Sequence, residues 1–108
     1  MDREEVALLQ GTLDLLVLRA LSDGPRHGYA IARWIASASG DALRIEEGSL
    51  YPALHRMKES GWLAASWKKT DTGRRAKFYR LTRAGRRALG EETAVWKAFV
   101  KAVQKVMS

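Results

Sequence analysis

The sequence predicts a mainly α-helical domain that carries one small β-hairpin. Apolar residues recur at spacings of three and four in several segments, which is typical of amphipathic helices. Two strand-like stretches, "WLAASWKK" and "AKFYRL", flank the turn-forming stretch "TDTGRR". The chain has 108 residues, of which 46% are hydrophobic, so it has the size of one domain and enough apolar surface for a core.

The N-terminal part predicts two helices. Residues 3–9 can form a short helix that places Val6 and Leu9 on one face. A second helix begins after Thr12, whose hydroxyl is suited to cap it. The stretch "SDGP" at residues 22–25 has the composition of a turn, so this helix ends before it.

Two further elements are expected before the middle of the chain. Apolar positions predict a helix from about His27 to Ser39, and Gly40 is a suitable stop. The stretch "ALRI" at residues 42–45 alternates apolar and polar residues and predicts a short strand.

The next helix is expected from about Ser49 to Ser60, with Ser49 as its cap. Pro52 then falls in the first turn, where a missing N–H removes no helix hydrogen bond. The buried face is made by Leu50, Leu54 and Met57.

The hairpin follows, with its turn at residues 70–73. Alternation along the second strand directs Tyr79 and Leu81 toward the core and Phe78 away from it. Phe78 is expected to pack against Trp67 across the hairpin.

A long helix is expected from Thr82, its cap, to Met107, and it would measure about 39 Å. The rest of the domain should be only about 25 to 30 Å across, so this helix must project and needs a partner for its apolar face. The simplest partner is a second copy of the chain. The expected interface residues are Val6, Leu9, Leu89, Trp96, Phe99, Val100, Val103 and Val106. Trp96 is either an ordinary interface anchor, which we favour, or a surface on which a planar ligand stacks.

Three helices followed by a two-stranded hairpin are the winged helix-turn-helix arrangement, in which the second helix of the helix-turn-helix unit enters the major groove of DNA. On this prediction residues 1–81 are the DNA-binding part and residues 82–108 the dimerisation helix of one compact unit.

Positive charge is concentrated at the hairpin. The net charge is +7 for the whole chain. Residues 68–87 contain nine cations and one acid, and the rest of the chain is close to neutral. This distribution favours a polyanionic partner, although a solvated basic strip is the alternative. The candidate phosphate-binding residues are Lys68, Lys69, Arg74, Arg75 and Lys77.

The outward face of the helix that begins near Ser49 is the candidate base-reading surface. It carries Ser49, Tyr51, Pro52, His55 and Arg56 near the helix N-terminus, from which recognition helices contact base edges. Tyr51 has an alternative role, which is to pack against the hairpin.

The stretches "LLQGTLDLLVLRAL", "HGYAIARWI", "EEGSLYPALHRMKESGWL" and "RRAKFYRLTRAGRRAL" resemble the PadR family of bacterial transcriptional regulators in its short form, across essentially the whole chain. The first stretch is most similar to an acidobacterial-type branch. The resemblance implies that the protein is a winged-helix dimer that represses neighbouring genes. Some members of the family release DNA when phenolic acids or planar drugs bind to them. The resemblance assigns His27 and Tyr29 to the start of the helix-turn-helix, and Tyr51, Pro52, His55 and Arg56 to the recognition helix.

The expected function is therefore that of a homodimeric, sequence-specific repressor that binds a pseudo-palindromic double-stranded operator. An enzyme is disfavoured because the chain has two His, no Cys and no paired catalytic constellation. For the same reason no metal or cofactor is expected. A winged-helix module for protein contacts or non-specific nucleic-acid binding is the alternative. The absence of cysteine fits the cytoplasm, and no apolar run is long enough to span a membrane.

Overall fold

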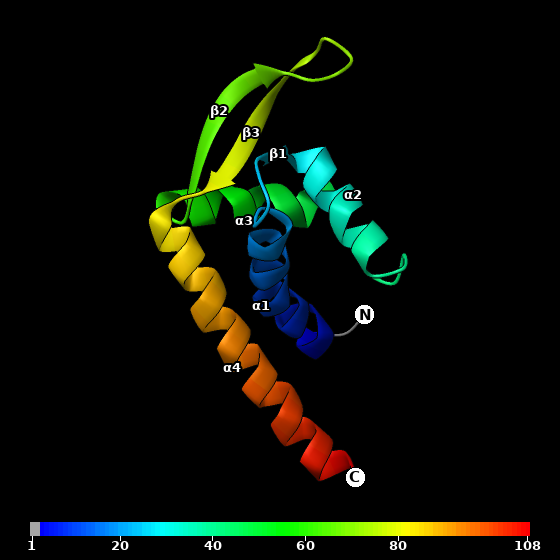
Figure 1. The fold of residues 1–108 in the computed structure, drawn as a ribbon. Helices are drawn as coiled ribbons and strands as arrows, with labels where there is room; N and C mark the ends of the chain where they lie inside the picture. Colours follow the sequence, from blue (N-terminus) through cyan, green and yellow to red (C-terminus); the bar gives the residue numbers. More distant parts are fainter. Residues whose placement is uncertain (1–2) are drawn as a thin grey trace.

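Four helices and three strands make up the described part of the chain, which in this computed structural model is the backbone of residues 3–108 and the side chains from residue 11 onward. Figure 1 shows α1, α2 and α3 packed together, the hairpin standing over them, and α4 running away from the hairpin past α1. In chain order the elements are α1 (Arg3–Ala20), β1 (Arg26–His27), α2 (Gly28–Ala38), α3 (Glu47–Glu59), β2 (Leu63–Lys69), β3 (Arg75–Leu81) and α4 (Arg83–Met107).

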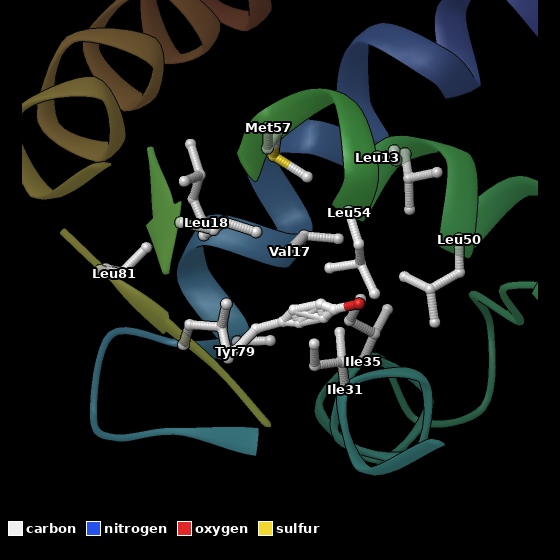
Figure 2. Packing of buried hydrophobic residues seen from close by; sticks show 14 of the residues in the cluster. Leu13, Val17, Leu18, Ile31, Ile35, Leu50, Leu54, Met57, Tyr79 and Leu81 are labelled. Carbon is white, nitrogen blue, oxygen red and sulfur yellow. The ribbon is translucent and has the colours of Figure 1, made fainter. Parts of the chain in front are cut away.

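The core is an apolar cluster to which all three packed helices and the hairpin contribute. Helical spacing places Val17 and Leu18 of α1 and Leu54 of α3 on the inner faces, and each is fully buried. Tyr79 reaches from β3 into the middle of this group (Figure 2). The predicted burial of Tyr79 and Leu81 is confirmed.

The three strands form one antiparallel sheet in the order β1-β3-β2. The hairpin is confirmed, with Leu63 opposite Leu81 at its base and Lys69 opposite Arg75 near its tip. The two-residue strand β1 was not predicted, because it is too short to show a periodicity and exists only through its pairing with β3. An Arg26 guanidinium that hydrogen-bonds the Asp23 carboxylate at 2.6 Å closes the turn before β1. This bond lowers the pKa of Asp23 below its ordinary value.

The predictions for residues 3–20 and for residues 42–45 are wrong. The two N-terminal helices form the single helix α1, and Thr12 lies inside it instead of capping its start. Gly11 does not interrupt the helix, because a glycine in a helix interior costs only about 0.5 to 1 kcal/mol relative to alanine. No strand forms at residues 42–45. Leu43 and Ile45 still face the core at alternate positions, but this segment has no partner strand, so its alternation produces an extended loop.

The N-cap of helix α3 is Glu46, three residues before the predicted cap Ser49, and the helix begins at Glu47. The Glu46 carbonyl accepts the N–H groups of Ser49 and Leu50, both at 3.0 Å, so the first turn is already closed before Ser49 can cap it. Pro52 is therefore the sixth residue of the helix. It removes one helix hydrogen bond, the one that its N–H would have donated to the carbonyl of Gly48.

Helix α4 projects beyond the rest of the domain as predicted, and the molecule measures 51 × 29 × 23 Å. The predicted cap is confirmed, since the Thr82 hydroxyl accepts the N–H of Gly85 at 3.0 Å. The same hydroxyl donates to the Gly61 carbonyl at 2.6 Å, which ties the start of α4 to the end of α3. Within residues 3–108, no helix combines the length and apolar character needed to cross a membrane.

Gly85 lies against the backbone at the α4 junction, and we expect its replacement to be costly. A Cβ at this position would stand 2.1 Å from the carbonyl oxygen of Trp62, which is backbone and cannot swing away. We therefore expect Gly85→Ala to lower the free energy of unfolding by about 1 to 3 kcal/mol or more in a urea titration.

Gly90→Ala is the matched control in the same helix, because a Cβ there meets nothing within 4 Å. It should raise the free energy of unfolding by up to about 1 kcal/mol, since alanine favours the helix. Equal effects of the two substitutions would contradict the close packing at Gly85.

Candidate nucleic-acid interface

The wing, which we define as residues 63–81, has two different faces that its strand register separates. Directly opposite residues share a face, so Trp67 lies with Lys77, and Lys69 with Arg75. The Trp67 side chain is 60% exposed, and the Arg75 guanidinium carbon lies 6.0 Å from its ring centroid. This face continues into Tyr79, so its outer half combines an aromatic ring with three cations.

The opposite face of the wing carries Phe78, which stands across from Ser66. The predicted packing of Phe78 on Trp67 is therefore wrong, because the two rings point to opposite sides of the sheet. Phe78 instead contacts His27 edge-on, with ring centroids 5.2 Å apart. That contact joins the wing to the start of α2.

His27 has a structural role at the N-terminus of α2. Its Nδ1 accepts the N–H of Ala30 at 3.2 Å, so the imidazole is the N-cap of the helix. Since Nδ1 is an acceptor, the proton of the neutral ring must be on Nε2. The His27 ring also stacks parallel to Tyr29 at a centroid distance of 6.4 Å. Pairing with β3, capping and ring contacts together fix where α2 begins.

Tyr51 of α3 fits against this junction because residue 28 is glycine. A Cβ at Gly28 would come within 2.8 Å of both the Tyr51 ring and its hydroxyl. Tyr51 nevertheless remains 45% exposed. Burial is the main cause that raises the pKa of Tyr79 above its ordinary value of 10.0, and the nearby Tyr51 phenol is the second. Tyr79 is therefore neutral at physiological pH. Tyr51 thus lies between α2 and the wing, with one edge open to solvent.

A groove of about 760 Å³ separates the wing from the starts of α2 and α3. Five aromatic rings line it, namely those of His27, Tyr29, Tyr51, Trp67 and Tyr79. The charged side chains on its wall are Arg74, Arg75, Lys77 and Asp71, which leave it net positive. Such a combination of cations and aromatic surfaces suits a sugar–phosphate backbone.

The outer face of α3 adjoins this groove. Ser49, Pro52 and His55 are exposed there, on the side away from the buried Leu54. Arg56 is exposed as well but turns toward α1, where its guanidinium bonds the Asp14 carboxylate at 2.5 Å. This ion pair was not predicted, because its two residues are 42 positions apart and no local pattern connects them.

The structure brings together some of the predicted residues and separates others. His27, Tyr29, Tyr51, Arg74, Arg75 and Lys77 all line the groove. Lys69 lies on the same face of the wing as Trp67 and Tyr79, which we call the inner wing face. Lys68 lies with Phe78 on the opposite face, the outer wing face. Trp67 and the wing-tip threonines Thr70 and Thr72 also line the groove and were not predicted to. The sequence did contain a signal for Trp67, because residues two apart in a strand share a face and Trp67 is two residues from Lys69.

The outer half of α4 presents an apolar surface. Trp96, Phe99 and Val103 are exposed on one side, and Phe99 is 56% exposed. Val106 is exposed near the end of the helix and Val100 is half-buried. Leu89 differs, because it packs against the core of its own chain. The side chains of Val6 and Leu9 lie outside the described residues.

A helix, a short strand, two further helices and a hairpin in this order define the winged helix-turn-helix class of fold. The family model of the transcriptional regulator PadR-like family matches residues 17–91. The chain therefore belongs to the PadR-like family of DNA-binding transcriptional regulators, as its sequence motifs predicted. A transcriptional regulator of Mycobacterium tuberculosis is 36% identical over 78 residues, which cover 72% of this chain and 69% of that protein.

Solved structures agree with this family. A PadR-family transcriptional regulator from Eggerthella lenta has a TM-score of 0.78 and 33% identity, and the match covers 97% of this chain and 89% of that one. A PadR-like transcription factor from Bacteroides fragilis has a TM-score of 0.77 and 30% identity, with coverage of 97% and 99%. A transcriptional regulator from Clostridium thermocellum shares the fold with a TM-score of 0.85 at 24% identity, with coverage of 94% and 99%.

The cap at His27 can be tested separately from any ligand. We expect His27→Ala to lower the free energy of unfolding by about 0.5 to 2 kcal/mol, because the α2 N-terminus loses its acceptor. His27→Asn should recover part of this loss, since asparagine is a preferred N-cap but cannot replace the contact with Phe78. Urea titrations of the three proteins provide the measurement. Equal losses in both variants would show that the ring contact, and not the cap, stabilises this helix.

Proposed function

We propose that this protein is a homodimeric, sequence-specific DNA-binding repressor of neighbouring genes, without enzymatic activity of its own. The observation that carries the proposal is the positively charged, aromatic-lined groove between the wing and the starts of α2 and α3. It supports DNA binding because a strand of the duplex can pass through it while α3 contacts the bases. As a regulator of transcription the protein would act in the cytoplasm, where bacterial DNA lies.

The two contact surfaces would have different tasks. The exposed side of α3 would enter the major groove, where Ser49 and Tyr51 near the helix start and His55 one turn further along would contact base edges. Lys69, Arg75 and Lys77 of the inner wing face, together with Arg74 at the wing tip, would bind phosphates, which adds affinity without sequence information. Lys68 on the outer wing face would contribute less.

Arg56 would contribute to DNA binding only in competition with Asp14. The pair is partly exposed, with side-chain exposures of 55% for Arg56 and 25% for Asp14. Exposed pairs of this kind contribute little to stability, so a DNA phosphate or guanine base can replace Asp14 as the partner. Arg56 is therefore proposed as a conditional contact, weaker than the wing arginines.

The projecting part of α4 supports dimerisation. An apolar face around Trp96, Phe99 and Val103 has no cover within the described chain, and a two-fold partner would bury it. Residues 1–81 would then bind DNA and residues 82–108 would join the two copies. A two-fold dimer would recognise a pseudo-palindromic operator with half-sites about one helical turn apart.

Trp96 would serve mainly as an anchor of that interface, because aromatic residues dominate binding energy at interfaces. A subordinate proposal is that a small planar ligand stacks on the exposed part of Trp96 near the two-fold axis and relieves repression. Such an effector would act through the dimer geometry and would not touch the DNA-binding groove.

Selection from a random duplex library followed by binding titrations tests the function even though the operator sequence is not specified in advance. We expect the selected duplex to be preferred over scrambled DNA by about 10³-fold or more. Arg74→Ala combined with Arg75→Ala should weaken binding to both duplexes and reduce the slope of log affinity against log salt by about 0.9 for each lost phosphate contact.

Lys101→Ala combined with Lys105→Ala is the control, because it removes the same charge from α4, away from the wing. It should leave the salt slope near that of the unchanged protein. A chain that binds every duplex equally would be a non-specific nucleic-acid binder, and one that binds none would be a module for protein contacts. Either outcome would refute the proposed repressor function.

Dimerisation is tested by placing a charge on the apolar face of α4. Phe99→Glu should convert the dimer to a monomer in sedimentation experiments at micromolar concentration, because a partner would have to bury the carboxylate. Ala98→Glu, one residue earlier on a different side of the helix, should remain dimeric. If the unchanged protein sediments as a well-folded monomer, or if both variants remain dimers, α4 is not the interface.

A further inference from the structure

Two residues that oppose helix formation lie one turn apart at the start of α3. Gly48 is the second residue of the helix and Pro52 the sixth. Glycine is entropically unfavourable in helices, and proline provides no N–H. Because Pro52 has no N–H, the Gly48 carbonyl lacks its usual partner four residues further along.

The fold of the described chain does not require glycine at position 48. Its φ is not positive, unlike that of Gly61 or Gly73, so its backbone conformation is open to any residue. A Cβ at Gly48 would meet no atom within 4 Å. Gly28 and Gly85 are different, because a Cβ at either would stand within 3 Å of a neighbouring group.

Position 48 belongs to the outermost line of α3. At 100° per residue, Gly48 lies beside Pro52 and His55 and almost opposite the buried Leu50 and Met57. All three outer residues are exposed. Local rules of helix formation are thus broken twice on one exposed surface, which is the pattern expected where a partner binds.

The charges at this turn indicate which part of DNA approaches it. Glu46 and Glu47 directly precede Gly48, and both are exposed. Two carboxylates would repel a phosphate, although the N-terminus of a helix otherwise attracts anions. The acceptors available here, the carboxylates and the Gly48 carbonyl, instead match the exocyclic amino groups of cytosine and adenine in the major groove.

We propose that Gly48 is a specificity-determining residue at which the DNA contacts the helix backbone directly, with a base amino group as the approaching donor. The missing side chain lets the first turn of α3 reach the base edges, and Tyr51 and His55 are carried inward with it. This inference rests on the proposed DNA-binding function and adds a contact to it.

Gly48→Ala should change stability and binding in opposite directions. Alanine favours the helix and has open space, so we expect the melting temperature to rise by a few degrees. Affinity for the selected duplex should fall by at least about tenfold, whereas affinity for scrambled DNA should change much less, because phosphate contacts are unaffected. Melting curves and titrations at one fixed salt concentration provide both values.

Gly90→Ala is the matched control, because it is also an exposed helical glycine with open space around its Cβ. It should raise the melting temperature and leave both affinities unchanged. The inference is overturned if Gly48→Ala keeps full affinity for the selected duplex, or if it lowers the melting temperature, since glycine would then serve the fold. If the unchanged protein prefers no duplex, the proposed function itself fails.

Discussion

The orientation of α3 depends on the packing of its apolar face, and the rest of the candidate interface depends on that orientation. Leu50, Leu54 and Met57 are almost completely buried, on the side of α3 that packs against α1, α2 and strand β2. Their burial removes water from one side of α3, so any rotation of the helix about its axis would expose leucine side chains to solvent. The opposite side, with Gly48, Pro52 and His55, is consequently held toward solvent with little freedom to turn away.

The position of the wing relative to α3 is set by a second group of contacts. Strand β3 pairs with β1 on one edge and β2 on the other, so the hairpin cannot pivot independently of the start of α2. His27 adds a helix cap and the ring contact with Phe78 at the same place. Because residue 28 is glycine, the Tyr51 ring has room to pack against the same place. The groove is therefore formed by a rigid junction of three elements, which suits a surface that must match a duplex of fixed dimensions.

The two ends of helix α4 have different surroundings: the first turns are packed against the domain, and the outer half is exposed. Its first turns are tied to the domain by the Thr82 cap and by Gly85, which packs directly on the backbone at Trp62. Beyond Leu89 the large apolar side chains are exposed, apart from the half-buried Val100. Any partner bound to the outer half would transmit its position to the wing through these first turns, because β3 ends directly before them.

The sequence by itself determined the helix faces, the hairpin, the Thr82 cap and the concentration of positive charge, because each depends on residues that are near neighbours in the chain. It also placed Tyr51, Pro52 and His55 on the outer side of α3. Tertiary structure decided strand β1, the Gly28–Tyr51 contact and the ion pair between Arg56 and Asp14. Each of these joins residues more than twenty positions apart, and periodicity over a few turns carries no information about such partners.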